Sequence, residues 1–458
     1  MMKLLLQVPL PGFLNLPPRL PDLGLGYLAK AVKTRGHEVT LLSWNTDMDE
    51  DGYIAFLKNL SPHIVGIKAF TKDVKGALQT LTLAKETLPG CIAIMGGPHV
   101  SAEDPEEIFL DFPAADYAFR GEAEEGLPVL MTLLEQGGGK GPEEATLETV
   151  PGLVWKQDGA VKNNPPSFSA DLDRIGAPDW SIQPLTDFDL CRLGKKEESP
   201  WMLPIAGTRG CPGRCSFCCA ACANGSRVRA RSADNVMEEI ISLHEEYRIK
   251  HLMITDTNFT YYPDILLEFC RRLEKERLGI TFGCPTGPDL SMLTRETLAA
   301  MKTAGCEYIG IGVESVAPEA RKRMKKGHTL EQISDTTKIA TGLGIAVQGF
   351  FMLGFPRETL EEMKASIRFA FSHDFLPLHF EICYPLPGTG IYRDLKEMYR
   401  LDRIDWKDFD VYRSPYPLSE LSSEKLYRLL RRTRMKTWYH PGLLGSKLKK
   451  LIRRPYGV

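Results

Sequence analysis

Short runs of hydrophobic residues alternate with amphipathic segments along the first 140 residues of the chain. Five of these runs predict buried β-strands: KLLLQVPL, HEVTLL, HIVGIKAF, CIAIMGG and ADYAFRG. The segments between and after them carry apolar residues at helical spacing, and they predict helices near 24–35, 51–60, 73–88, 103–111 and 124–136. Alternation of strand and helix is typical of α/β proteins, so we expect a doubly wound, parallel sheet.

A second alternating series begins at Leu203. Its strand-like runs are LPIAGTR, HLMITD, ITFGCP, YIGIGVES, AVQGFFMLG and LHFEICYPLP. Helical patterns lie between them, as in SADNVMEEIISLHEEY, where Ser232 is placed to cap the helix. Six βα units predict a sheet that curls toward a barrel without reaching the eight strands of the closed form.

A glycine-rich stretch from Gln136 to Pro142 indicates a break between the two series. A proline-rich linker follows, and within it GLVWKQDGAVK predicts a β-hairpin that turns at Asp158 and Gly159. We therefore expect four units. A Rossmann-like domain covers residues 1–140, and a linker with a hairpin covers 141–200. A partial (βα)6 barrel covers 201–395, and a small helical, basic C-terminal region covers 396–458.

Composition and charge narrow the class of protein. The 458 residues are 43% hydrophobic and 25% charged, with a net charge of −2, which is typical of a globular protein and argues against nucleic-acid binding. The eleven cysteines lie mostly singly outside one cluster, which indicates a reducing compartment rather than a disulfide framework. No run reaches the roughly 20 apolar residues of a transmembrane helix. The first residues lack the apolar core of a signal peptide, so we expect a cytoplasmic enzyme.

The stretch GTRGCPGRCSFCCAACANG places five cysteines directly after the first strand of the second series. Cys211, Cys215 and Cys218 are spaced C-x3-C-x2-C, and three thiolates from one loop can bind three irons of a cubane cluster while the fourth iron stays open for chemistry. Zinc is the alternative, because Cys215/Cys218 and Cys219/Cys222 form two C-x2-C pairs. These pairs adjoin with no residue between them, which leaves little chain for a four-thiolate zinc knuckle, so the spacing favours the cluster over zinc. Cys219 and Cys222 lie outside the C-x3-C-x2-C motif, and we interpret them as packed thiols.

With Phe217 just before its third cysteine, this motif resembles the signature of the radical SAM superfamily. The resemblance implies a [4Fe-4S] cluster whose open iron binds S-adenosylmethionine (SAM), which one electron splits to a 5′-deoxyadenosyl radical. It also implies SAM contacts by Asp256 and Asn258 after the second strand, and by Glu314 and Ser315 after the fourth. GFFMLGFPRET and CYPLPGTGIY match two further segments of the superfamily's barrel. Taken alone, Glu314 would more often be a carboxylate paired with a lysine or arginine.

The first domain carries a different resemblance. Gly24, Gly26 and Ala29 fit a dinucleotide fingerprint only superficially, because they lie well beyond the first strand and no acidic residue ends the second. Together, LGLGYLAKAVKTRGHEV, VGIKAF, GGPHVS and RGEAEE resemble the cobalamin-binding domain of one large radical SAM class. That class includes cobalamin-dependent C-methylases and the anaerobic magnesium-protoporphyrin cyclase.

The resemblance implies cobalamin-binding residues in three loops: Phe70, Thr71, Lys72, Gly96, Gly97, His99, Ser101, Gly121 and Glu122. The glycines permit close approach of a bulky ligand to the backbone. The domain contains no Asp-x-His-x-x-Gly motif, so we expect base-off cobalamin without a histidine below the cobalt and with the loop from Phe70 to Asp73 facing the lower side of the corrin. His99 then belongs to the nucleotide-tail pocket or only forms hydrogen bonds within its loop.

These resemblances imply a methyltransferase that uses methylcobalamin. An unactivated carbon cannot attack the sulfonium of SAM, but a substrate radical made by the 5′-deoxyadenosyl radical can take methyl from methylcobalamin. The alternatives are a cobalamin-dependent cyclase or rearrangement enzyme without net methylation, and a non-catalytic cobalamin or metal sensor. The substrate is expected to be a peptide or protein residue (such as glutamine in methyl-coenzyme M reductase), a small natural product or a lipid. The expected electron donor is a flavodoxin or ferredoxin.

The C-terminal region is strongly basic. From Lys425 to Val458 there are eleven lysine and arginine residues and no acidic one. The segment SKLKKLIRR fits a helix packed on the barrel with a solvated face, contact with an anionic membrane surface, or steering of an acidic protein substrate. Trp438 and Tyr439 beside Pro441 favour packing.

Overall fold

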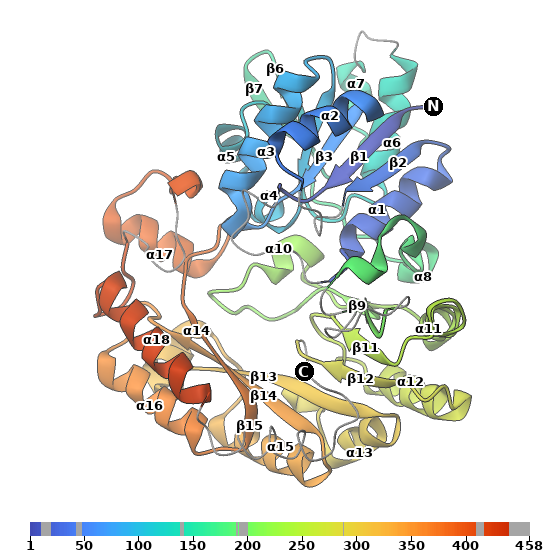
Figure 1. The fold of residues 1–458 in the computed structure, drawn as a ribbon. Helices are drawn as coiled ribbons and strands as arrows, with labels where there is room; N and C mark the ends of the chain where they lie inside the picture. Colours follow the sequence, from blue (N-terminus) through green and yellow to red (C-terminus); the bar gives the residue numbers. More distant parts are fainter. Residues whose placement is uncertain are drawn as a thin grey trace.

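The computed structural model describes residues 1–10, 20–42, 48–137, 142–188, 191, 200–286, 288–408 and 416–438. The chain forms two α/β units, which lie one above the other in Figure 1. The glycine-rich residues 138–141 and the basic segment SKLKKLIRR lie outside the described residues.

The first sheet has the strand order β2-β1-β3-β4-β5-β6-β7. Its parallel strands match the five predicted runs: β1 (Lys3–Gln7), β2 (Glu38–Leu42), β3 (Ile64–Lys68), β4 (Ile92–Gly96) and β5 (Tyr117–Phe119). Along β1, Leu5 belongs to the hydrophobic core on one face, and Leu4 and Leu6 belong to the core on the other. Burial on both faces explains why these strands appear in the sequence as continuous hydrophobic runs.

Helices cover both faces of this sheet (Figure 1): α1 (Leu23–Thr34), α2 (Glu50–Leu60), α3 (Val74–Thr87), α4 (Pro98–Ala102), α5 (Pro105–Asp111) and α6 (Gly126–Gln136). Five of them match the predicted helices, with α5 in the segment near 103–111, and the short helix α4 lies before that segment and was not predicted. The boundary between α4 and α5 lies at Asp104, whose carboxylate accepts a hydrogen bond from the backbone N–H of Glu106, while Pro105 occupies the first turn of α5.

The predicted hairpin forms, and it extends the first sheet. β6 (Leu153–Gln157) pairs antiparallel with β5, and β7 (Ala160–Asn163) pairs with β6. The hairpin therefore completes the sheet of the first unit, although the sequence led us to place it in the linker after residue 140. Its Asp-Gly turn reveals the hairpin but not the sheet edge that it joins. Two short helices flank it, α7 (Glu144–Leu147) and α8 (Leu172–Ile175).

The second sheet is an open, six-stranded parallel sheet with the order β15-β14-β13-β12-β11-β8 (Figure 1). Its strands confirm the prediction of six βα units: β8 (Met202–Ile205), β11 (His251–Ile254), β12 (Thr281–Cys284), β13 (Cys306–Glu314), β14 (Ala346–Leu353) and β15 (Phe375–Ile382). The terminal strands β8 and β15 are not paired with each other, so the described sheet is a partial barrel. A small ribbon of β9 (Thr208–Arg209) and β10 (Arg229–Ala230) lies beside it.

The helices of the second unit are α10 (Ala220–Asn224), α11 (Ala233–Tyr247), α12 (Pro263–Glu276), α13 (Arg295–Thr303), α14 (Pro318–Met324), α15 (Leu330–Gly342), α16 (Leu360–Phe371), α17 (Gly390–Tyr399) and α18 (Ser423–Trp438). Ser232 caps α11 as predicted, because its side chain accepts a hydrogen bond from the backbone N–H of Asn235. Leu426 and Leu430 place α18 on the barrel core, and the Arg434 guanidinium donates to the carbonyl of Phe380 on edge strand β15.

Side chains along the barrel strands alternate between a core under the helices and a concave face. On β14, Val347, Phe351 and Leu353 are buried in the core, whereas Phe350 and Met352 are half-buried on the other face. A parallel barrel presents its reactive groups at the carboxyl ends of its strands. The loops after β8, β11 and β13 are therefore the places to look for a site.

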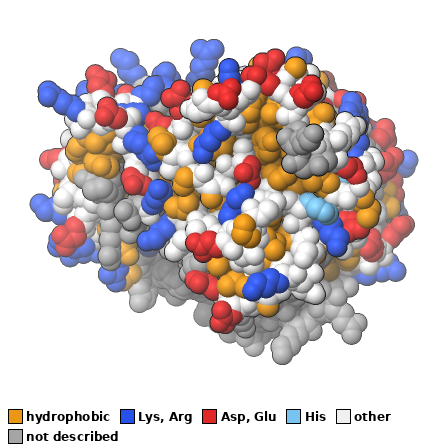
Figure 2. Space-filling view, turned by 90° about the horizontal axis from the view of Figure 1, so that it is seen from above, with side chains coloured by type: hydrophobic (Ala, Val, Ile, Leu, Met, Phe, Trp, Pro, Cys, Tyr) orange, Lys and Arg blue, Asp and Glu red, His pale blue; other side chains and the backbone are white. Residues whose placement is uncertain are grey.

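The outer surface shows little segregation of charge. Lysine and arginine side chains are interspersed with aspartate and glutamate over the face seen from above (Figure 2), as a net charge of −2 leads us to expect. Among the described residues, no helix combines the length and the apolar character that a membrane span requires.

Candidate active site

The loop that carries the cysteines starts after β8, and Asp256 fixes its first residues. Asp256 follows β11 and is 2% exposed, and its carboxylate accepts hydrogen bonds from the backbone N–H groups of Gly207 and Thr208. Burial raises the pKa of Asp256 to about 6, although these hydrogen bonds lower it in part. The side chain that we expected to contact SAM is therefore used to hold the backbone leading into the cysteine loop.

The next residues of β11's loop hold Gly210. The Thr257 hydroxyl and the Asn258 side-chain amide donate hydrogen bonds to the Gly210 carbonyl, at 2.9 Å and 3.2 Å. Gly210 has φ +98, and a Cβ atom there would overlap the carbonyl of Arg227, so only glycine fits this approach. Asn258, also expected at the SAM site, is 8% exposed and is likewise committed to the loop.

The three motif cysteines face a common space. An ideal Cβ atom at Gly213 would lie 3.2 Å from the Cys211 Sγ and 3.9 Å from the Cys215 Sγ, so both thiols face a volume that a side chain would fill. Burial raises the pKa of the Cys218 thiol, and the Cys215 and Cys211 thiols contribute to this increase. This arrangement of three thiols from one loop fits a cluster held by three thiolates.

Sulfur spacing distinguishes a cluster from zinc. Tetrahedral zinc with Zn–S bonds of about 2.3 Å would hold its ligand sulfur atoms about 3.8 Å apart. Among the described residues, the only group of three or more metal-ligating side chains with ligand atoms within 4.8 Å of one another is His99, Glu103 and Asp111, which contains no cysteine. No three of the described cysteines therefore have all their Sγ atoms within 4.8 Å of one another, which does not match the close sulfur spacing of a zinc knuckle.

Cys219 and Cys222 lie on the outgoing side of the loop. Both are half-buried, and the Cys222 N–H donates to the Cys219 carbonyl at 2.9 Å as α10 begins. The Cys222 Sγ lies 3.2 Å from the position of an ideal Cβ atom at Gly388, in the segment that leads to α17. Their role as packed thiols stays a prediction.

Glu314 and a lysine lie together beside the cysteines. Glu314 ends β13 with φ +65, and its Oε1 atom lies 3.2 Å from the Nζ atom of Lys326. Burial raises the pKa of the Cys215 thiol, while the Lys326 ammonium lowers it. Phe217 lies next to this pair, with its ring centre 6.0 Å from the Lys326 Nζ atom. A pairing with a lysine or arginine is what we expected of Glu314 when it is considered without the surrounding motifs.

Ser315 has a different environment. It is 0% exposed, and its hydroxyl donates to the Oε1 atom of Glu358 at 3.0 Å. The other carboxylate oxygen of Glu358 accepts hydrogen bonds from the backbone N–H groups of Gly354 and Phe355. Ser315 and Glu358 thus tie the ends of β13 and β14 together, and the described Ser315 side chain faces protein rather than open space.

A cavity of about 180 Å³ opens at the carboxyl edge of the first sheet. Five of the residues expected to bind cobalamin line it: Gly96, Gly97, Ser101, Gly121 and Glu122. Leucine and isoleucine side chains from β1, β3 and β4 form its inner wall, and Ala223 and Asn224 of α10 complete it. An ideal Cβ atom at Gly96 would meet no heavy atom within 4 Å, so the glycine loop leaves room for a bulky, largely apolar group. The lining residues fit the nucleotide tail of cobalamin.

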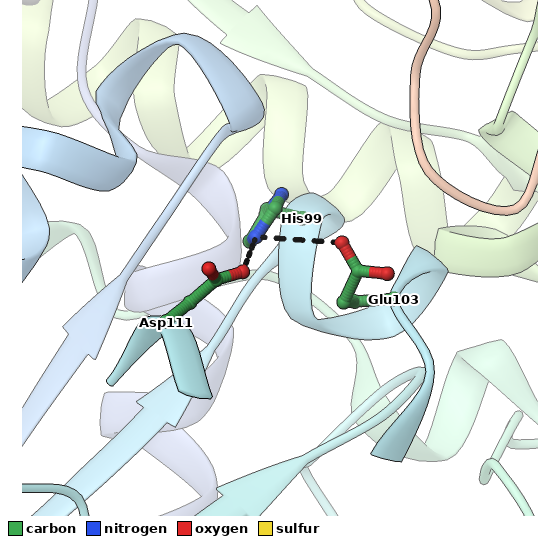
Figure 3. Close-up of side chains that lie close together, drawn as sticks. All are labelled: His99, Glu103 and Asp111. Carbon is green, nitrogen blue, oxygen red and sulfur yellow. Dashed lines mark hydrogen bonds and ion pairs between the residues drawn. The ribbon is translucent and has the colours of Figure 1, made fainter. Parts of the chain in front are cut away.

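His99 lies on α4 and does not line the cavity; its ring lies close to the carboxylates of Asp111 and Glu103 (Figure 3). It is 1% exposed, with Nδ1 3.2 Å from the Thr71 hydroxyl and Nε2 3.3 Å from the Asp111 Oδ2. The Glu103 carboxylate lies 4.0 Å from Nε2. We expected His99 either in the nucleotide-tail pocket or in hydrogen bonds alone. The contacts that it makes, with Thr71 and Asp111, are hydrogen bonds to neighbouring segments.

His99, Glu103 and Asp111 are close enough to share a cation, but their other contacts argue against one. The Arg403 guanidinium lies 2.6 Å from the Asp111 Oδ1, and the Trp406 indole N–H donates to the Glu103 Oε2 at 2.8 Å. Burial and the nearby Glu107 carboxylate together raise the pKa of Glu103 to about 8. Because both carboxylates already have partners and Arg403 adds a positive charge, the group is an ion-paired anchor for the segment after α17.

The loop expected below the corrin borders a second space. Phe70 is 41% exposed, Lys72 is exposed, and Thr71 is buried against His99 in a short 3-10 turn, Thr71–Asp73. A cleft of about 440 Å³ lies between the two units, and both contribute to its walls. The first unit supplies Asp22, Lys68 and Phe70, and the barrel supplies Pro204, Ala206, Thr208, Thr255, Asp256 and Thr257.

Charged pairs join the two units beside this cleft. Glu122 receives two hydrogen bonds from the Arg229 guanidinium, at 2.8 Å and 2.7 Å, and Arg209 pairs with Glu124 at 2.7 Å. The Glu122 and Arg229 side chains are only 8% and 9% exposed. Glu122, which we expected at cobalamin, therefore also clamps the first unit to β10.

Comparison with known proteins agrees with both halves of this description. The B12 binding domain matches residues 11–131, and the Radical SAM superfamily matches residues 205–370. An uncharacterized methyltransferase of Pyrococcus horikoshii is 30% identical over 443 residues, which cover 94% of this chain and 93% of the relative. The chain belongs to the cobalamin-dependent radical SAM enzymes.

Other members of this enzyme family differ in their named reactions. The cytidylyl-2-hydroxyethylphosphonate methyltransferase of Streptomyces wedmorensis is 27% identical and covers 88% of this chain and 82% of its own length. The anaerobic magnesium-protoporphyrin IX monomethyl ester cyclase of Rubrivivax gelatinosus is also 27% identical, over 87% of this chain and 69% of its own length. The solved structure of the cobalamin-dependent S-adenosylmethionine radical enzyme OxsB, with aqua-cobalamin and S-adenosylmethionine bound, has a TM-score of 0.73 at 20% identity and shares the fold over 95% of this chain and 66% of that one.

Membership of the radical SAM enzymes implies a [4Fe-4S] cluster and SAM, and the B12 binding domain implies cobalamin. Sequence reasoning missed three residues around these sites: Lys326, Glu358 and Arg229. Glu358 lies within GFPRET, which the sequence does single out, so the motif pointed to it. Lys326 lies in a basic run, RKRMKKGH, where no pattern separates it from its solvated neighbours.

Proposed function

We propose that this cobalamin-dependent radical SAM enzyme transfers a methyl group from methylcobalamin to an unactivated carbon of its substrate. The observation that carries the proposal is the cleft of about 440 Å³, because it is walled by Phe70 and Lys68 of the cobalamin-binding unit and by barrel strand ends beside the cysteine loop. A substrate in this cleft would lie within reach of both cofactors. The names of the relatives from P. horikoshii and S. wedmorensis support methyl transfer.

The residues divide the tasks of such an enzyme among them. When bound, the cluster supplies the electron that cleaves SAM, and cobalamin supplies the methyl group. Cys211, Cys215 and Cys218 would hold the cluster, while Asp256 and Asn258 keep their loop in place. We further propose that SAM is contacted by Asp256 and Asn258 after β11 and by Glu314 and Ser315 at the end of β13.

The residues that line the cavity and the cleft support a proposal for the state of the cobalamin. The glycine loop and the apolar cavity behind it would receive the nucleotide tail, which leaves the base away from the cobalt. No histidine lines the cavity or the cleft in the part of the chain that the structure describes. This supports base-off cobalamin without a histidine ligand, with Phe70 and its neighbours facing the lower side of the corrin.

A cyclase or rearrangement enzyme without net methylation is the second candidate, favoured by the likeness to the R. gelatinosus cyclase. Product mass separates the two. The protein is reconstituted anaerobically with iron, sulfide, cobalamin and SAM, reduced by flavodoxin or ferredoxin, and incubated with three substrate classes: glutamine-containing peptides of methyl-coenzyme M reductase, small natural products and lipids. A product heavier by one methyl group supports the proposal, and a product that forms without that gain supports the cyclase. Failure to cleave SAM would contradict both and favour a sensor.

A further inference from the structure

A partly buried ion pair lies over barrel strand β13. The Glu314 and Lys326 side chains are each only 15% exposed, with 3.2 Å between the Glu314 Oε1 and the Lys326 Nζ. An ideal Cβ atom at Gly312 would lie 2.5 Å from the Glu314 Oε1 and 3.0 Å from the Lys326 Nζ. Both charged groups thus lie on the bare backbone of Gly312, on the side of β13 away from the core residues Ile311 and Val313.

The local structure fixes the lysine in this place. The Arg321 guanidinium donates to the carbonyls of Val313 and Ser315, at 3.0 Å and 2.9 Å, on either side of Glu314. The backbone N–H of Lys326 donates to the Arg321 carbonyl at 3.2 Å, after Lys325 ends α14 in a left-handed conformation. One arginine therefore ties the end of β13 to the turn that carries Lys326.

The cysteine loop is attached to the same turn. The backbone N–H of Ser216 donates to the carbonyl of Met324 at 3.1 Å, two residues before Lys326. Phe217 follows, with its ring centre 6.0 Å from the Lys326 Nζ atom. The hydrogen bond and the ring contact thus hold the turn of Lys326 against the two residues that lie between Cys215 and Cys218.

We propose that Lys326 is a positioning residue whose positive charge raises the reduction potential of the cluster, and that the negative charge of Glu314 lowers it. The inference rests on the proposed function only in requiring that Cys211, Cys215 and Cys218 hold a [4Fe-4S] cluster. Reduction adds one electron, from a low-potential donor, and no proton, so the cluster and its thiolates become more negative by one charge. A fixed, poorly solvated cation beside them stabilises the reduced form, and a fixed anion destabilises it.

The test compares midpoint potentials of the full-length protein, reconstituted anaerobically and titrated with dithionite in the absence of SAM. Electron paramagnetic resonance of the reduced cluster gives the midpoint of each variant at matched iron and sulfide content. Lys326→Met should move the midpoint to a more negative potential, whereas Glu314→Gln should move it to a more positive one. Lys326→Arg keeps the charge and should stay near the wild-type value. Lys322→Met removes an exposed lysine of α14 and serves as the matched control, with no shift expected.

Opposite shifts in Lys326→Met and Glu314→Gln are the expected result, and an unchanged or more positive midpoint in Lys326→Met overturns the inference. If Lys326→Met does not hold a cluster, Glu314→Gln decides, because an unchanged or lowered midpoint in that variant overturns it equally. Methyl transfer is read separately from product mass. Opposite potential shifts without any methylated product would contradict the proposed function alone, and methylated product with unmoved potentials would contradict this inference alone.

Discussion

Side chains around the cysteine loop either hold the loop or face it. Asp256, Thr257 and Asn258 hydrogen-bond to the backbone of residues 207–210, whereas Glu314 and Lys326 lie on the side of Cys215. The sequence identified most of these polar residues, because they follow barrel strands. The sequence could not show which of these side chains hold the cysteine loop and which face it, because that depends on the backbone groups that the folded loop presents.

At the residue scale, the cysteines give the first prediction. Replacing Cys211, Cys215 or Cys218 with alanine should abolish cluster absorbance and SAM cleavage, because each removes one of three thiolates. Cys219→Ala and Cys222→Ala should retain both, since these thiols pack beside the loop. Iron and sulfide content and SAM cleavage of the reconstituted variants provide the measurement. Loss of iron from Cys222→Ala as complete as from Cys215→Ala would favour four-thiolate ligation.

Asp256 gives a second prediction, on pH. Burial raises its folded-state pKa from 3.8 to about 6, so the folded protein keeps a proton that the unfolded chain releases between these values. The stability contributed by the protonated carboxyl is fully present below about pH 4 and lost as the pH rises through about 6. Asp256→Asn should avoid this loss, so its unfolding free energy relative to wild type should rise by about 3 kcal/mol between about pH 4 and about pH 7. Urea unfolding across this range measures the difference, and a constant difference would contradict the prediction.

At the scale of elements, the sequence predicted the strands but not which distant segments the hairpin and the turns contact. All eleven predicted hydrophobic runs contain strands, because buried parallel strands must be apolar on both faces. β15 begins earlier than its run, at Phe375, and tolerates Pro377 because it is an edge strand that lacks a neighbour on one side. Two features depend on contacts between residues distant in sequence, which no local pattern predicts. One is the sheet that the β6–β7 hairpin joins, and the other is the turn that places Lys326 beside the cysteine loop.

The glycine loop after β4 gives a third prediction. Gly97 has φ +97, and a Cβ atom there would lie 2.8 Å from the Ala69 carbonyl oxygen. Gly97→Ala should strain the loop by about 1–3 kcal/mol and weaken cobalamin binding about tenfold, because the loop lines the cavity. Cobalamin retained after gel filtration measures the effect. Gly90→Ala is the control, since its Cβ would meet no heavy atom within 4 Å, and equal losses in both variants would contradict a specific role for Gly97.

At the scale of the whole molecule, buried charges connect the two units. One hydrophobic cluster spans the two units, with Phe109 and Phe112 of the first and Ile391 and Trp406 of the second. The Glu122–Arg229 pair also crosses between them, with both side chains less than 10% exposed. A buried pair is costly to break from one side, because the remaining charge has no partner. The relative placement of the two units therefore depends on this charged pair as well as on the shared apolar cluster.

The fourth prediction tests this pair. Arg229→Met should lower the unfolding free energy by about 3–5 kcal/mol, and adding Glu122→Gln should recover part of that loss because no buried charge is left alone. Chemical unfolding of the single and double variants gives the coupling. Lys364→Met is the control, since its pair with Glu361 is exposed and should be worth at most about 1 kcal/mol. Additive losses in the double variant would show that the pair is not coupled.

The short helix α10 begins two residues after Cys218, yet its Ala223 and Asn224 form part of the wall of the cavity under the glycine loop. One stretch of chain is thus shared by the metal loop and by the compartment for the nucleotide tail. Folding of the cysteine loop and completion of the cavity wall are consequently coupled, because α10 belongs to both.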